Sequence, residues 1–269
     1  MARNRNPRGE MPFLDHLEEL RWRILWSLLA ITLGTLVSFV LFVRYEILEL
    51  LMAPIRRGYG DPNLELIYLS PATPFFVTLK LAIYGGVILA FPIIVYEIWA
   101  FLSPALEKRE KRAVIPALYL GLVLFLAGVA LAYFVALPVT LEFFQGFQSA
   151  SLEGQLEINA TLGFVVKLLL AFGVVFELPV VIMALSALGL VTPKFLREKR
   201  RHAIVLITIL ASFITPGDAI TLTLMMMLPL VLLYEFGILL SVWIWRGRAR
   251  RDAELEMGLE PPPDAVGSA

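Results

Sequence analysis

Long apolar runs are the feature of this sequence that most restricts how it can fold. A helix that crosses the ~30 Å hydrocarbon core of a bilayer needs roughly 20 mostly apolar residues. Such runs cover residues 24–43, 75–101, 113–139 and 162–188, and a fifth apolar stretch extends over 203–245. Hydrophobic residues make up 59% of the chain and charged residues 17%, whereas soluble domains contain about half and a quarter. The chain is therefore predicted to be an integral membrane protein.

The last apolar stretch is divided by a turn. Its Pro216-Gly217 pair is a turn signal, and Asp218 is suited to cap the helix that follows. We therefore expect two spans joined by a hairpin, which gives an all-α, polytopic membrane protein with six transmembrane helices. The first of these two spans, Ala203–Ile214, is short for a bilayer. A five-span chain in which this segment is re-entrant is the alternative.

One membrane domain, residues 1–245, is expected to contain all the spans. It would begin with an amphipathic helix over Met11–Arg23 that leads directly into the first span. A short amphipathic helix is predicted at Leu48–Met52, ended by Pro54. Residues 246–269, which include several acids and three consecutive prolines, are expected to form a disordered cytoplasmic tail.

Basic residues are sorted unequally between the two sides of the predicted bundle. Of the 23 Lys and Arg residues, eighteen lie in the two terminal segments and the second and fourth connections. The first connection holds three, and the third and fifth hold none. The positive-inside rule places the richer side in the cytoplasm, so both termini are predicted to be cytoplasmic. A five-span chain would leave the basic tail outside, which favours six spans.

Several classes of function find no support in the sequence. There is no Cys, and the two His residues, His16 and His202, lie far apart, so we expect no metal site. The zinc-protease motif and the G-x-S-x-G motif are both missing. Equal numbers of acidic and basic residues, 23 each, argue against a nucleic-acid binder. We expect neither enzymatic activity nor a cofactor.

Glu177 lies near the middle of the predicted span 162–188, next to Leu178-Pro179. An ionisable residue at this depth costs a few kcal/mol, and it usually faces the bundle interior or a wet cavity. We interpret Glu177 as an intramembrane functional site. The structural alternative is a carboxyl group that hydrogen-bonds backbone freed by a kink at Pro179. A proton-coupled small-solute permease that titrates Glu177 is the alternative function.

Two acidic residues lie among bases on the predicted cytoplasmic side. Glu19 precedes the first span, and Glu110 lies in the second connection between Arg109 and Lys111. The simple interpretation is local pairing, as between Glu19 and Arg23 at i,i+4, worth about 0.3–0.5 kcal/mol. The functional interpretation is a carboxylate pair that receives guanidinium groups, because planar bidentate contacts favour arginine over lysine.

Four segments of the sequence form a recognisable set: Pro12–Arg21, Ser70–Phe75, Trp99–Leu106 with Glu110 after it, and Phe176–Pro179. Together they resemble the TatC family, the multispanning receptor of the twin-arginine protein translocase. Their order and their positions relative to the spans agree with the family, and the resemblance covers roughly Met11 to Trp245. It implies a protein of the bacterial or archaeal-type cytoplasmic membrane.

The resemblance also implies a binding site for the Arg-Arg motif of a signal peptide. By motif position, Glu19 and Glu110 would accept the two arginines, and Arg21 and Phe101 would help to shape the site. The cargo would be a folded protein that carries such a peptide. No bond is made or broken in this function.

Further family positions concern the outer loop and the partner subunits. Pro54 matches a family proline in the first outer loop. Glu177 matches an intramembrane glutamate that faces a concave groove and contacts partner helices. Thr215 and Asp218 match the tight fifth connection, near where single-span partners of the TatA and TatB type dock. Self-association in a larger complex, with export driven by the proton gradient, is also implied.

Overall fold

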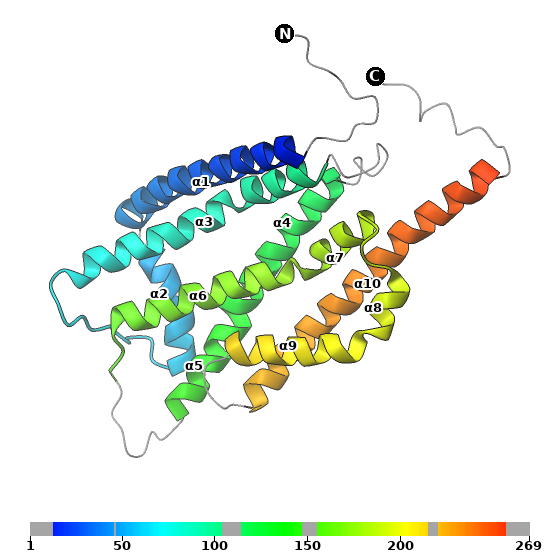
Figure 1. Ribbon diagram of the computed structural model, residues 1–269. Helices are drawn as coiled ribbons and strands as arrows, with labels where there is room; N and C mark the ends of the chain where they lie inside the picture. The colour runs from blue at the N-terminus through cyan, green and yellow to red at the C-terminus, as the bar shows by residue number, and fades with distance from the viewer. Residues whose placement is uncertain (1–12, 46, 104–113, 147–154, 215–219, 257–269) are drawn as a thin grey trace, which may run out of the picture. The chain divides into compact units, whose positions relative to one another are not determined.

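The computed structural model describes residues 13–45, 47–103, 114–146, 155–214 and 220–256 (Figure 1). Their regular structure is helical apart from one isolated parallel β-bridge between Ile67 and Glu157, which confirms the all-α class. The elements are α1 (Phe13–Arg44), α2 (Ile47–Tyr59), α3 (Thr73–Leu102), α4 (Val114–Leu131), the π-helix η3 (Ala132–Ala136), α5 (Leu137–Gly146), α6 (Ile158–Phe176), α7 (Leu178–Ala187), α8 (Pro193–Glu198), α9 (Arg200–Ile214) and α10 (Ile220–Glu256).

Within the described ranges, 5 helical stretches are long and apolar enough to cross a membrane. They are His16–Arg44, Thr73–Leu102, Pro116–Gly146, Ile158–Ala187 and Met226–Gly247. Each corresponds to one predicted span, so the chain is a polytopic membrane protein. The remaining predicted span lies in α9, whose 15 residues rise only about 22 Å. The count of six spans stays a prediction.

The chain divides into two compact units. The first contains residues 1–177 and 214–222, and the second contains residues 178–213 and 223–269. The boundary falls at Glu177, where α6 ends and α7 begins one residue later. The predicted single membrane domain over 1–245 stays a prediction.

In the first unit, α1 runs alongside α3, as Figure 1 shows. Small residues permit this close approach. A Cβ atom added at Gly34 would lie 2.6 Å from the carbonyl oxygen of Gly86, and one added at Gly86 would lie 2.4 Å from Thr35 Oγ1. Small residues at helix contacts are typical of membrane proteins, where close packing rather than the hydrophobic effect holds helices together. The helix is continuous from Phe13 to Arg44, so the described part of the N-terminal segment leads straight into the first span.

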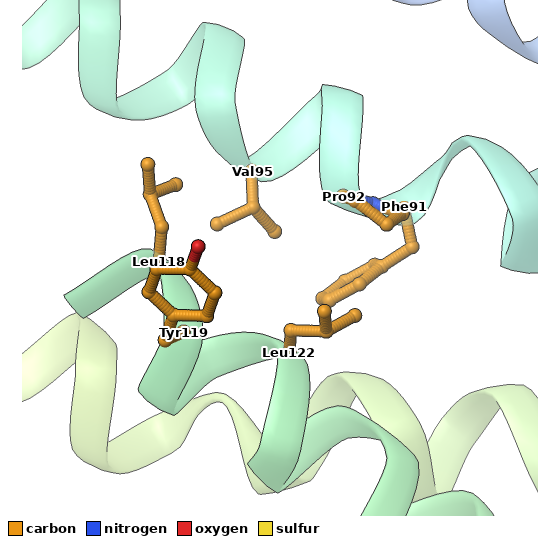
Figure 2. A pocket seen from close by; sticks show the side chains of 6 residues that line it. All are labelled: Phe91, Pro92, Val95, Leu118, Tyr119 and Leu122. Atoms are coloured by element: carbon orange, nitrogen blue, oxygen red, sulfur yellow. The ribbon is translucent and has the colours of Figure 1, made fainter. Parts of the chain in front are cut away.

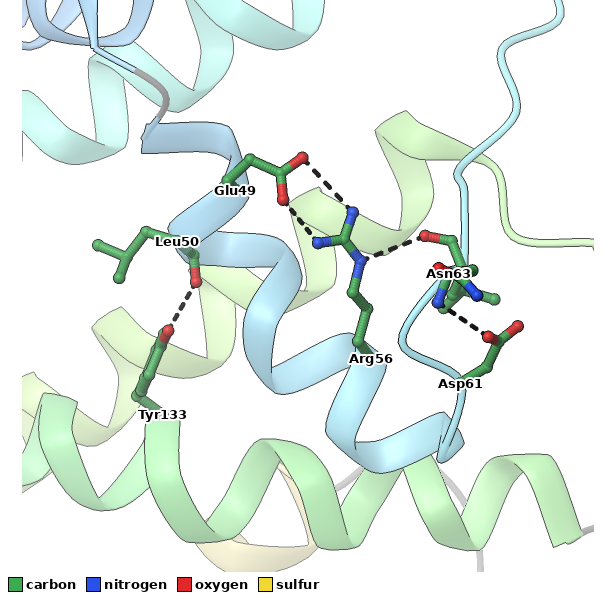
Figure 3. A network of polar contacts seen from close by, with 7 residues as sticks. Glu49, Leu50, Arg56, Asp61, Asn63 and Tyr133 are labelled. Carbon is green, nitrogen blue, oxygen red and sulfur yellow. Dashed lines mark hydrogen bonds and ion pairs between the residues drawn. The ribbon is translucent and has the colours of Figure 1, made fainter.

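Helix α2 corrects the prediction that Pro54 ends the short helix at Leu48–Met52. The helix continues to Tyr59 with Pro54 buried inside it. A proline has no backbone N–H, so Pro54 leaves the carbonyl of Leu50, four residues earlier, without its helical partner. The hydroxyl of Tyr133 donates a hydrogen bond of 2.6 Å to that carbonyl (Figure 3). A tertiary contact thus replaces the hydrogen bond that proline removes.

Tyr133 itself lies in η3, the π-helical turn between α4 and α5. Pro138 follows this turn, and in a regular α-helix its ring would meet the carbonyl of Phe134. The wider turn avoids this conflict, since the N–H of Leu137 bonds to the carbonyl of Ala132, five residues earlier. The helix therefore passes the predicted end at Val139 and reaches Gly146.

In the second unit, polar side chains join α10 to the segments that precede it. Ser186 Oγ donates to Ser241 Oγ at 2.7 Å, and Tyr234 Oη donates to the carbonyl of Leu196 at 2.8 Å. Helix α10 extends to Glu256, so residues 246–256 are helical where a disordered tail is expected. The rest of that tail lies outside the described residues.

Candidate functional site

Glu19, Arg23 and Glu97 form an ionic cluster, here called the α1–α3 cluster, where these two helices pack together. The guanidinium of Arg23 donates from Nη2 to Glu19 Oε1 at 3.1 Å and from Nη1 to Glu97 Oε2 at 3.0 Å. The first contact confirms the predicted i,i+4 pair. The second joins residues 74 positions apart, and Glu97 is buried, with 9% of its surface exposed. One guanidinium therefore lies between two carboxylates.

The second carboxylate oxygen of Glu19 is still available. Oε2 is buried and has no hydrogen-bond partner among the described residues. Nδ1 of His16 lies 3.9 Å from Oε2, beyond hydrogen-bond distance. Two acids around one guanidinium leave a net negative charge and one carboxylate oxygen without a partner among the described residues, so the cluster is suited to accept a further donor.

Phe101 is placed beside this cluster through His16. The two rings stack with centroids 4.3 Å apart and an interplanar angle of 13°. His16 lies one helical turn before Glu19 on α1, so the stack forms one wall next to the carboxylate. The structure thus brings Phe101 and Glu19 into one region.

Glu177 occupies the break between α6 and α7. Its backbone N–H bonds to the carbonyl of Val174 at 3.1 Å and ends α6, because Pro179 cannot continue the hydrogen-bond ladder. The carboxylate lies against Gly121 of α4, where an added Cβ would be 3.0 Å from Oε2. Oε1 is buried without a hydrogen-bond partner among the described residues. Oε1 therefore accepts no hydrogen bond from the described backbone near Pro179, and the role of Glu177 stays a prediction.

A small apolar pocket of about 260 Å³ lies between α3 and α4. Figure 2 shows Phe91, Pro92 and Val95 from α3 facing Leu118, Tyr119 and Leu122 from α4. The pocket is on the side of α3 that faces α4, whereas Glu97 contacts α1. It is therefore separate from the α1–α3 cluster. Among the described residues, no group of three or more His, Asp or Glu side chains is placed to hold a metal ion.

Comparison with known proteins decides the family. Residues 15–229 match the model of the family "Sec-independent protein translocase protein (TatC)". The TatC protein of Aquifex aeolicus (strain VF5) is 39% identical over 208 residues, which cover 77% of this chain and 85% of that relative. The chain belongs to the TatC family. The Escherichia coli (strain K12) TatC is 36% identical over 214 residues, 79% of this chain and 81% of the relative.

A solved structure supports the same assignment. The crystal structure of the twin arginine translocase receptor TatC is 38% identical to this chain, with a TM-score of 0.71 over 85% of this chain and 99% of that one. The family resemblance seen in the sequence is confirmed. The comparisons support a component of the Sec-independent protein translocase and give no support to a solute permease.

The other predicted site residues of this TatC-family chain are spread over several elements. Arg21 is exposed on α1, and Pro54 lies in the interior of α2. Glu110, Thr215 and Asp218 lie outside the described residues. Their roles stay predictions.

Three residues of these sites were not predicted from the sequence. The sequence did not single out Glu97 or Gly121, and it brought in His16 only as a candidate metal ligand and as part of the segment Pro12–Arg21. A buried acid in a span is a recognisable signal for Glu97, but its partner depends on which helices pack together. The contact between Gly121 and Glu177 likewise depends on the packing of α4 against α6.

Proposed function

We propose that this chain is the signal-peptide-binding core subunit of its translocase. Glu19 and Glu110 accept the two arginines of an Arg-Arg signal peptide on the cytoplasmic face, and Arg21 and Phe101 shape the site. The observation that carries the proposal is the buried, unpartnered Oε2 of Glu19 beside a guanidinium that two carboxylates already hold.

The geometry of the α1–α3 cluster supports the proposed preference for arginine. Arg23 shows that Glu19 binds a guanidinium in this setting, through a charge-assisted contact of 3.1 Å. An incoming arginine donates to the unpartnered Oε2 once movement of the surrounding side chains exposes this buried atom, and it competes with Arg23 for Oε1. Glu97 retains Arg23 during this exchange, because their contact of 3.0 Å is independent of Glu19. A lysine ammonium has no planar fork and cannot match this arrangement.

Glu177 serves as the intramembrane polar site for a partner or signal helix. Its buried Oε1 lacks a donor among the described residues, and a polar group in that state gains from any donor that a neighbouring helix supplies. Thr215 and Asp218 are proposed to lie near the docking site of TatA-type and TatB-type single-span proteins. These subunits gather around the loaded receptor and open a path driven by the proton gradient.

Six spans with both termini in the cytoplasm are part of the proposal. This topology places Glu19, Glu110 and most of the basic residues on one side, where a signal peptide arrives. The protein binds and recruits, and it performs no bond-making step.

Photo-crosslinking tests the proposed function. A twin-arginine peptide that carries a photoreactive group is irradiated with the purified complex, with and without Glu19→Ala plus Glu110→Ala. We expect the double variant to lose most of the crosslink. Glu18→Ala, which removes an exposed neighbouring acid, is the matched control and should retain it. Unchanged crosslinking in the double variant would overturn the proposal.

A further inference from the structure

We propose that a pocket between α8 and α10 binds the headgroup of an anionic phospholipid. The pocket has a volume of about 610 Å³ and lies wholly within the second unit. Cationic, apolar and small side chains share its wall. The residues that carry the argument are Lys194, Arg197, Glu198, Val242, Trp245 and Arg246.

The charges of this α8–α10 pocket favour a phosphate group. Three cations face one acid, which leaves a surplus of positive charge. Lys194 Nζ lies 4.0 Å from Glu198 Oε1, and the side chains of Lys194 and Glu198 are 87% and 62% exposed, so this pair is weak. Arg197 and Arg246 form no ion pair with any side chain that the structure describes. Two unpaired guanidinium groups at one pocket match the oxygens of a phosphodiester.

The position of the pocket favours a lipid over a soluble anion. The apolar span of α10 ends at Gly247, so Trp245 and Arg246 lie at the membrane surface. Tryptophan is enriched at this level, and Trp245 is held there by a hydrogen bond of 3.2 Å from Nε1 to the carbonyl of Val191.

The same helix also offers a path for an acyl chain. Val242 forms an apolar part of the pocket, and on the same stretch of α10 Leu239 is 63% exposed and Trp243 is 66% exposed. A headgroup bound by the arginines thus has an apolar surface beneath it. Basic pockets between helices at the membrane surface commonly bind anionic lipids. The inference does not depend on signal-peptide recognition.

Native mass spectrometry of the detergent-purified protein tests the inference. The protein is mixed with phosphatidylglycerol or with phosphatidylcholine, and the retained lipid is measured. We expect phosphatidylglycerol to be retained in preference. The variant Arg197→Gln plus Arg246→Gln should weaken its retention by about 30-fold, from ~1 kcal/mol for each cation.

A matched variant distinguishes the loss of cations in the pocket from a general loss of positive charge. Lys199→Gln plus Arg201→Gln removes two exposed cations from the same connection, neither of which lines the pocket. It should retain phosphatidylglycerol nearly as well as the original protein. Equal loss in both variants, or no loss in the pocket variant, would overturn the inference.

Competition with inorganic phosphate and glycerol phosphate distinguishes a lipid from a free anion. Neither should displace phosphatidylglycerol at equal concentration, because neither has an acyl chain to contact α10. Displacement by either one would show a simple anion site and would contradict the lipid assignment.

Discussion

Arg23 occupies one oxygen of Glu19 with one guanidinium nitrogen and contacts Glu97 with another. Glu97→Gln would remove the negative charge that draws Arg23 away from Glu19, so Arg23 would compete more strongly with an incoming arginine. We expect the dissociation constant of a twin-arginine peptide to rise about fivefold, which corresponds to ~1 kcal/mol. Fluorescence anisotropy with a labelled peptide measures this change.

A double-mutant cycle shows whether Glu97 acts through Arg23. In an Arg23→Gln background the competitor is gone, so Glu97→Gln should change peptide binding little. If Glu97→Gln weakens peptide binding equally in both backgrounds, Glu97 does not act through Arg23. The proposed replacement of Arg23 by a peptide arginine at Glu19 would then be wrong.

Gly121 leaves space for the carboxylate of Glu177, because a Cβ atom added at Gly121 would lie 3.0 Å from Glu177 Oε2. Gly121→Ala should push the carboxylate aside and lower the stability by roughly 1 kcal/mol, the lower range for overpacking. Thermal unfolding in detergent measures the loss, which should largely disappear in a Glu177→Ala background. Gly247→Ala is the control, because nothing lies within 4 Å of its added Cβ. Equal losses at both glycines would contradict the account.

At the scale of elements, α2 and the α4–η3–α5 helix are joined by the hydrogen bond from Tyr133 to the carbonyl of Leu50. Tyr133→Phe removes the donor, and we expect a loss of about 1 kcal/mol in the free energy of unfolding. Pro54→Ala restores a backbone N–H for the same carbonyl, so Tyr133→Phe should cost less in that background. Chemical unfolding of the four proteins measures this coupling, and a cost independent of residue 54 would disprove it.

The helices themselves were largely predictable, because hydropathy alone determines which segments favour a bilayer. The residues at which the helices begin and end were less predictable. Pro54 has no backbone N–H, which predicts the end of a helix. The hydrogen bond that replaces the missing one comes from Tyr133, 79 positions away in the sequence, and this contact could not be predicted locally. Similarly, Glu19 was predictable from its motif and its local pair with Arg23. The part played by Glu97 depends on α1 packing against α3, and no local pattern encodes that pairing.

At the scale of the whole molecule, the unequal sorting of basic residues predicts both termini in the cytoplasm. The chain has no Cys, so single substitutions give a clean labelling experiment. A membrane-impermeant maleimide added to intact cells should label Ser151→Cys and Gly217→Cys but neither Ala2→Cys nor Ala253→Cys. Labelling at residue 217 tests the short span in particular. Protection of that residue together with labelling at residue 253 would support five spans.

The central claim is that Glu19 binds an arginine of the signal peptide. The most direct test is the ratio of dissociation constants for a twin-arginine peptide and its twin-lysine counterpart. In the original protein we expect the arginine peptide to bind roughly tenfold or more tightly, because its contacts are planar and charge-assisted. Glu19→Gln should remove most of this preference, and Glu18→Gln should keep it. If Glu19→Gln discriminates between the peptides as well as the original protein does, Glu19 does not bind an arginine of the signal peptide.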